Sequence, residues 1–133
     1  MRGASALQEA LTEKAKLPLR VFVVWEPVLV TDIAPPTTRT LGLIHDSRAA
    51  QYWDRERVLS EDIVRALRAD PSRYPVGDEL EKVDEETIVW DFIALFPRGV
   101  LWERDIPVPV FHGFPVVRSI AGLRQGLASA SQR

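Results

Sequence analysis

The chain contains no cysteine, and this absence excludes more chemistry than any other. Without cysteine the protein has no disulfide, no thiolate nucleophile, no Cys-ligated zinc and no iron–sulfur cluster. It also lacks a basic surplus, since 17 Lys and Arg stand against 19 Asp and Glu and the net charge is -2. Proteins that bind nucleic acid usually concentrate positive charge against the phosphates. We therefore expect neither thiol chemistry nor a nucleic-acid partner.

Long apolar runs are absent as well. No stretch approaches the roughly 18 uninterrupted apolar residues of a membrane span, and the N-terminus lacks the apolar core of a signal peptide. We expect a soluble, cytoplasmic protein with no membrane partner. An apolar fraction of 46% over 133 residues is enough for the core of one domain. That domain is predicted to span 1–133, with its core at about 19–128, an N-terminal helix in 1–17 and a frayed tail at 129–133.

Apolar periodicity and turn residues predict alternating helices and strands. Helical spacing and capping signals, among them the capping-box pair Ser5 and Gln8 and a cap at Ser60, predict helices at 5–16, about 35–44, 60–70 and 118–129. β-Branched and aromatic runs predict strands at 19–30, 48–54, 87–96 and 100–103, with a hairpin between the last two. The acidic segment 71–86 is predicted to be a solvated connector or, alternatively, a docking surface. Residues 105–117 carry three prolines and are predicted to form an extended apolar loop.

This order of elements, a βαβ half followed by a ββα half, is that of the thioredoxin fold. The string Val24-Trp25-Glu26-Pro27 resembles the strand end that precedes the Cys-x-x-Cys motif of thioredoxins. The chain resembles cysteine-less, redox-inactive bacterial thioredoxin-like proteins over about 19–128. The resemblance implies an α/β fold with one βαβ-ββα mixed sheet, helices on both faces and an extra N-terminal helix. Another α/β sandwich with a mixed sheet is the alternative if 48–54 is not a strand.

The residues at the position of the Cys-x-x-Cys motif exclude the redox activity of the family. Leu29 and Asp32 stand where the two cysteines would lie, and Asp84-Glu85-Glu86 replaces the cis-proline expected before the third core strand. The chain is therefore not a thiol-disulfide oxidoreductase. The resemblance argues for the fold and not for the activity.

Three titratable residues are candidates for acid–base chemistry. Asp32 follows the first strand, where open α/β sheets commonly present their sites, although a residue of this kind more often caps a helix. Asp91 is the only charge in the strand TIVWDFIALF, so it needs a partner or a raised pKa unless it faces solvent or a covering arginine such as Arg39. The resemblance places His112 beside the substrate groove of the fold. No nucleophile in a strained turn accompanies these residues.

Two surfaces are candidates for binding. The resemblance implies a groove beside the lost Cys-x-x-Cys position, formed by Trp25, Pro27, Asp32, Pro35, Thr37, His112 and Gly113. The proline-broken loop offers a second surface, formed by Val108, Val110, Phe111 and Phe114. This loop either closes the core or meets a partner or another copy of the chain. A monomer and a homodimer are both compatible with the sequence.

The function that fits best is binding of a protein or peptide by a non-redox thioredoxin-like module. The alternative is a non-redox enzyme, or a protein that binds a small ligand or metal, using Asp32, His112 or Asp91. His45 and His112 are the only histidines and lack the spacing of a metal site. We expect no cofactor, and a binding role is favoured over catalysis.

Overall fold

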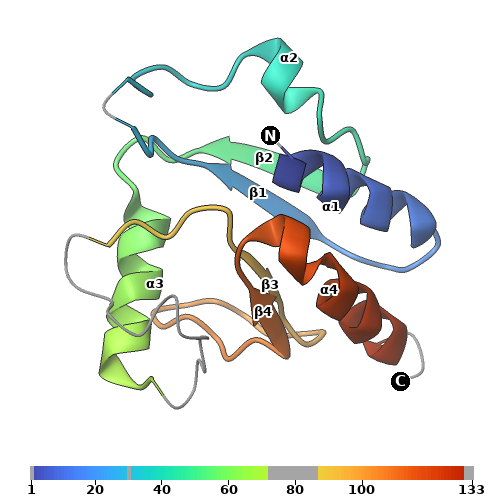
Figure 1. Ribbon diagram of the computed structural model, residues 1–133. Coiled ribbons are helices and arrows are strands. Elements are labelled where there is room, and N and C mark those ends of the chain that lie inside the picture. The colour runs from blue at the N-terminus through green and yellow to red at the C-terminus, as the bar shows by residue number, and fades with distance from the viewer. Residues whose placement is uncertain (1, 30, 72–86, 131–133) are drawn as a thin grey trace.

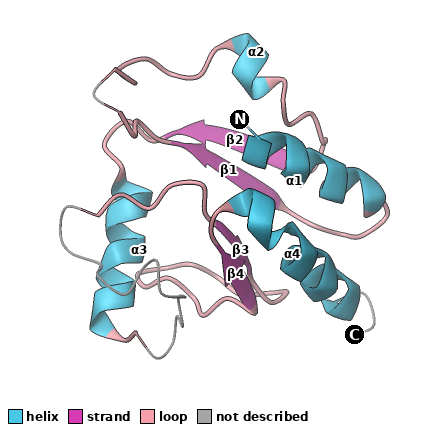
Figure 2. Cartoon of the chain, in the orientation of Figure 1, coloured by secondary structure: helices cyan, strands magenta, loops and turns pink. Residues whose placement is uncertain are grey.

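The computed structural model describes residues 2–29, 31–71 and 87–130, which form a mixed α/β arrangement (Figures 1 and 2). In chain order the elements are α1 (Arg2–Glu13), β1 (Val21–Trp25), α2 (Thr38–Leu41), β2 (Ala49–Trp53), α3 (Val58–Ala69), β3 (Ile93–Leu95), β4 (Phe111–Gly113) and α4 (Val116–Ala130). None of these helices has the length and apolar character needed to cross a membrane.

The strands pair as two separate ribbons over the described residues. β1 and β2 are parallel, with Val21 opposite Ala49 and Trp25 opposite Trp53. β3 and β4 are antiparallel, with Ile93 opposite Gly113. A parallel pair followed by an antiparallel pair agrees with the predicted order of elements. The single mixed sheet that the resemblance implied is not observed, because β1 and β3 do not pair.

Two apolar clusters form the core, one on each side of β3. Side chains alternate along a strand, so Ile93 and Leu95 pack on the first cluster, whereas Phe96 packs on the second. The buried members of the first cluster, contributed by α1 and α4, are Ala10, Val116, Ile120, Leu123 and Leu127. The second cluster centres on Leu67 of α3 and Ile106. Helices α4 and α3 thus flank the β3–β4 ribbon (Figure 1).

In the N-terminal half, local signals located the elements but not all of their ends. The strand predicted at 48–54 is confirmed as β2, whereas the one predicted at 19–30 ends at Trp25, before Pro27, which cannot donate to a ladder. The predicted helix 5–16 begins at Arg2 and ends at Glu13. Ser5 does not cap it, and the Gln8 side chain accepts backbone N–H groups of His45 and Asp46 instead. α3 begins at Val58, so Ser60 lies in its first turn and is not its cap.

The C-terminal half departs further from the prediction. Of the strand predicted at 87–96, only Ile93–Leu95 is extended and paired, because Asp91 adopts a left-handed conformation with φ 52°. The predicted turn exists, with Gly99 at φ 79°. However, the partner of β3 is β4, within the predicted loop, and not 100–103.

The predicted tail also begins later than expected. α4 continues to Ala130, and its inward residues Ile120, Leu123 and Leu127 are confirmed as buried. Residues 131–133 of the tail, and 72–86 of the predicted acidic connector, lie outside the described residues.

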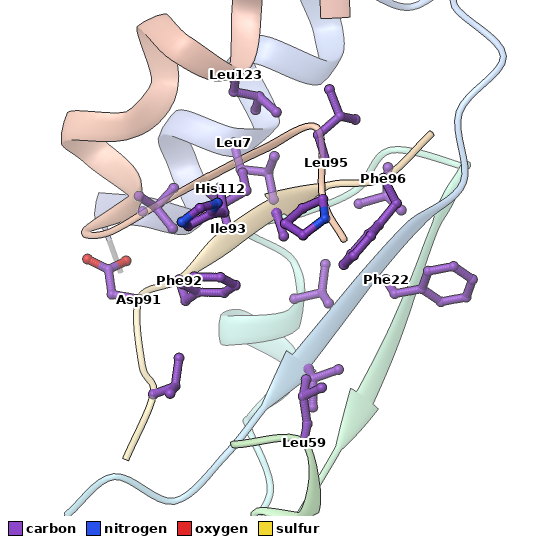
Figure 3. A pocket seen from close by; sticks show the side chains of 18 of the residues that line it. Leu7, Phe22, Leu59, Asp91, Phe92, Ile93, Leu95, Phe96, His112 and Leu123 are labelled. Atoms are coloured by element: carbon purple, nitrogen blue, oxygen red, sulfur yellow. The ribbon is translucent and has the colours of Figure 1, made fainter. Parts of the chain in front are cut away.

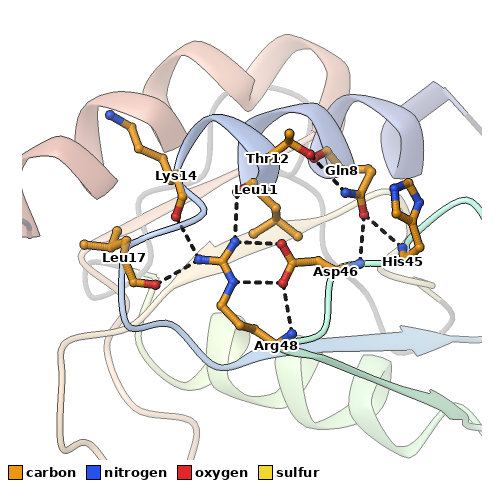
Figure 4. Close-up of polar contacts among 8 residues, drawn as sticks. All are labelled: Gln8, Leu11, Thr12, Lys14, Leu17, His45, Asp46 and Arg48. Atoms are coloured by element: carbon orange, nitrogen blue, oxygen red, sulfur yellow. Dashed lines mark hydrogen bonds and ion pairs between the residues drawn. The ribbon is translucent and has the colours of Figure 1, made fainter.

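Arg48 ties the end of α1 to the start of β2 (Figure 4). Its guanidinium donates to the carbonyl oxygens of Leu11, Lys14 and Leu17, each at 2.8 Å. Leu11 lies in the last turn of α1, and Lys14 and Leu17 follow its end. The carbonyls of Leu11 and Lys14 also accept backbone N–H groups, at 3.2 and 3.0 Å, so the guanidinium adds a second donor to each. Asp46 holds the guanidinium from the other side, with oxygen–nitrogen distances of 2.8 and 2.7 Å. The Gln8 side chain completes the network by accepting the backbone N–H groups of His45 and Asp46.

This network predicts a loss of stability in acid. Hydrogen bonds from Arg48 lower the pKa of Asp46 from 3.8 to about 2. Because the folded value lies below the ordinary one, the ion pair stabilises the native state above about pH 4 and loses this effect as the pH falls through about 2. We expect the free energy of unfolding, measured by urea titration, to fall in this window, and to fall less in Asp46→Asn. An equal fall in both proteins would contradict the assignment.

Candidate functional site

A cavity of about 2380 Å³ lies between β1 and β3 (Figure 3). All five residues of β1 and all three of β3 line it. Among the described residues, β2 contributes only Trp53 and β4 only His112. The inner edges of the two ribbons therefore face each other across the cavity.

The backbone groups on these edges can be assigned from the hydrogen bonds that are made. The Val21 N–H donates to the Arg48 carbonyl at 3.1 Å, and the Trp25 carbonyl accepts the Asp54 N–H at 2.9 Å. The backbone groups of these residues of β1 therefore point toward β2. Successive residues of a strand direct their N–H and C=O groups to opposite sides. Phe22 and Val24 therefore direct theirs toward the cavity.

The same reasoning applies to β3. The Leu95 carbonyl accepts from the N–H of Val110 at 2.7 Å, on the side of β4. The backbone groups of Ala94 therefore point the other way, toward β1. Both ribbons present hydrogen-bonding groups to the space between them.

The remaining walls of the cavity are largely apolar. On one side they come from α1 and α4, and on the other from α3 and the segments beside it. Figure 3 shows Leu7 and Leu123 on the first side and Leu59 on the second. The volume exceeds the roughly 300–1,000 Å³ of ordinary small-molecule pockets. The cavity can therefore hold a short length of polypeptide.

The structure brings five of the seven predicted groove residues to this cavity, namely Trp25, Asp32, Pro35, Thr37 and His112. Pro27 and Gly113 do not line it. The Trp25 indole N–H donates to the Gln51 side chain at 3.0 Å, and Gln51 donates to the carbonyls of Leu41 and Ile44. Trp25 thus also anchors the end of α2 on β2.

Asp32 and Asp91 have structural partners in the backbone. Asp32 Oδ2 accepts the N–H groups of Val28 and Leu29, at 3.2 and 2.8 Å, and so closes the loop after β1. The Asp91 carboxylate lies against Gly3 at the start of α1, and its carbonyl accepts the Val116 N–H at 2.9 Å. A carboxylate near a helix N-terminus is stabilised by the helix dipole. Asp91 therefore connects the beginnings of α1 and α4.

The two histidines lie in different surroundings. The ring of His112, in β4, lies 6.1 Å from the ring of Phe92 at the cavity (Figure 3). His45 is exposed, and its backbone N–H is bound by Gln8. Over residues 2–29, 31–71 and 87–130, no group of three or more His, Asp or Glu side chains could hold a metal ion.

The predicted apolar interface is divided by the fold. Val108 and Val110 are exposed, but Phe111 belongs to β4 and packs on the first core cluster. Phe114 is half-buried and meets Trp90 edge to face at 6.0 Å. The loop closes the core through buried Ile106. Its four predicted residues do not form one surface.

An acid pair, Glu26 and Asp54, was missed by the sequence reasoning. These residues directly follow Trp25 and Trp53, which are opposite one another in the parallel register. Burial is the main cause that raises the pKa of Glu26, to about 7. The neighbouring Asp54 also raises it, whereas hydrogen bonding from Ser60 and the charge of Arg57 lower it. A signal was present, because all four tryptophans of the chain are followed by an acidic residue. Because β1 and β2 are parallel, two of these Trp-acid pairs lie side by side at the carboxyl ends of the two strands.

Comparison with known proteins does not assign the chain to a family, since no family model, curated protein or solved structure matches it. Fold and cavity together define a mixed α/β protein with an apolar space between two unpaired strand edges.

Proposed function

We propose that this protein is a non-redox, thioredoxin-like binding module that receives an extended peptide segment of a partner protein between β1 and β3. The observation that carries the proposal is the pair of facing strand edges, both of which line the cavity. An added strand gains affinity from main-chain hydrogen bonds. Phe22 and Val24 on one edge and Ala94 on the other supply these groups.

The walls indicate the chemistry of the segment. A strand inserted here meets apolar side chains on both faces, as do the central strands of α/β sheets, which carry nearly continuous apolar runs. β1 has five residues, and a strand rises about 3.3 Å per residue. A run of about five apolar residues therefore matches the length of the cleft.

The alternative function, catalysis by Asp32, Asp91 or His112, has less support. Asp32 is engaged with two backbone N–H groups, and Asp91 lies at two helix starts. Both carboxylates therefore already have structural roles in the fold.

A selection experiment tests the proposal. Random decapeptides displayed on phage are panned against the wild-type protein, and selected peptides are titrated by tryptophan fluorescence, since Trp25, Trp90 and Trp102 line the cavity. We expect enrichment of uninterrupted apolar runs. Ala94→Pro removes the N–H that faces the cavity but no β3–β4 bond, and we expect it to weaken binding about five- to tenfold. Ala94→Val adds comparable bulk, keeps the N–H and serves as the control.

A change in the peptide tests the same bonds without altering the protein. N-methylation of a selected peptide at one amide removes one donor, and methylation at the next residue removes a donor on the opposite edge. Scanning methylation along the peptide should weaken binding at the positions that pair with β1 or β3. No enrichment in the selection, or equal affinity for all methylated peptides, would refute strand addition.

A further inference from the structure

We propose that a proton on Glu26, donated in a hydrogen bond to Asp54, holds the end of β1 against the start of α3. This inference does not depend on peptide binding. It concerns the carboxyl end of the β1–β2 ribbon, where neither residue was among the predicted site residues.

The strand register brings the two carboxylates together. Trp25 and Trp53 are paired, and the Asp54 N–H donates to the Trp25 carbonyl at 2.9 Å, so the acidic residues that follow are neighbours across the ribbon. Both side chains turn toward the first turn of α3. Glu26 Oε1 accepts the Ser60 N–H at 3.1 Å, and Asp54 Oδ2 accepts the Leu59 N–H at 2.8 Å.

One oxygen of this pair is left without a hydrogen bond. Glu26 Oε2 is buried and has no partner among the described residues. An ionised oxygen in this position would be both desolvated and close to a second negative charge, which is costly. A proton on Glu26 converts this oxygen into a donor toward Asp54, and the group is then satisfied. Paired acids elsewhere hold a proton for the same reason.

Burial outweighs the groups around Glu26 that favour its ionised form. Asp54, after β2, disfavours ionisation of Glu26, while Arg57, before α3, favours it. α3 itself contributes the Ser60 N–H, which also favours the ionised form. Burial is the largest influence and opposes ionisation, so the pKa of Glu26 is raised to about 7. The proton is therefore held at a pH where an exposed glutamate has lost it.

The proton has a mechanical consequence through Ser60. This residue is 2% exposed, and its Oγ accepts the N–H of Val89 at 2.6 Å. Glu26, Ser60 and Val89 thus connect β1, α3 and the segment that leads into β3. Loss of the proton leaves two negative charges facing the same helical turn. We expect all three elements to be held less firmly when the pair is fully ionised.

Two measurements test the inference on the protein without peptide. Carbon-13 NMR of the glutamate carboxyl groups gives the midpoint for Glu26 directly, and we expect it near pH 7. Because the folded pKa lies above the ordinary 4.5, the stabilisation is complete below about pH 4.5 and is lost as the pH rises through 7. The unfolding equilibrium constant, from urea titration, should therefore rise at least about tenfold between about pH 5 and pH 8.

Variants separate this pair from other acidic residues. Glu26→Gln imitates the protonated side chain and should abolish the rise, whereas Glu56→Gln, whose side chain is 81% exposed, should retain it. Asp54→Asn should shift the midpoint of Glu26 downward. A Glu26 midpoint near 4.5, or an unchanged rise in Glu26→Gln, would overturn the proposal. If Glu26→Gln fails to fold, the wild-type NMR titration still decides.

Discussion

Replacing Arg48 by alanine is expected to lower the free energy of unfolding by about 3 kcal/mol, because one part-buried side chain makes three hydrogen bonds to carbonyls and neutralises the carboxylate of Asp46. The guanidinium donates to the carbonyls of Leu11, Lys14 and Leu17, at and just after the end of α1, and it pairs with the carboxylate of Asp46. The Arg48 and Asp46 side chains are only 16% and 10% exposed, so water replaces the lost bonds incompletely. Urea denaturation at neutral pH measures the effect.

A matched control uses a second arginine that also contacts α1. Arg124 of α4 pairs with Glu13, but these side chains are 39% and 49% exposed. Exposed pairs contribute little, so Arg124→Ala should cost much less stability than Arg48→Ala. Arg48→Lys should recover only part of the loss, because an ammonium group cannot reproduce the planar fork. Equal losses in Arg48→Ala and Arg124→Ala would contradict the proposed role.

Gly113→Ala is expected to destabilise the protein by about 2 kcal/mol, because α4 packs directly on this residue of β4. A Cβ at Gly113 would collide with the side chain of Ser119, whose Cβ would lie only 2.6 Å away. Either the helix moves outward or the strand loses its register with Ile93. Thermal and urea unfolding both report the loss.

The double variant Gly113→Ala/Ser119→Gly tests whether this contact is the cause. Removing the Ser119 side chain makes room for the added methyl group, although glycine within a helix costs about 1 kcal/mol by itself. We expect the double variant to be more stable than the sum of the single effects predicts. Simple additivity would show that the destabilisation arises elsewhere.

Local sequence signals predicted individual helices and strands. They failed where contacts between distant segments decide which strands pair. Tyr52 and Trp53 identified β2, and the spacing of Ile120, Leu123 and Leu127 identified the buried face of α4. The turn at Gly99 was also found. The strand that pairs with β3 was not found. Phe111 of β4 packs against the first core cluster because α4 approaches it closely at Gly122. A turn signal carries no information about that distant helix.

The candidate site shows the same contrast between local signals and contacts of distant segments. Asp32 was selected for its place after the first strand, and Asp91 as the only charge in an apolar run. Nearby backbone groups are the partners of Asp32, and Asp91 lies beside α1. Glu26 and Asp54 are far apart in the chain, and their proximity depends on the register of β1 and β2. The cavity could not be predicted either, because it exists only where β1 and β3 fail to pair.

The shared cluster of α1 and α4 has a consequence for synthesis. Ala10 near one end of the chain is buried by residues that include Leu127 near the other. A ribosome makes α1 before α4, so the apolar face of α1 lacks its α4 partner while the intervening segments emerge. The nascent chain therefore completes its core only after release of α4. Until then it presents the kind of exposed apolar surface that chaperones bind.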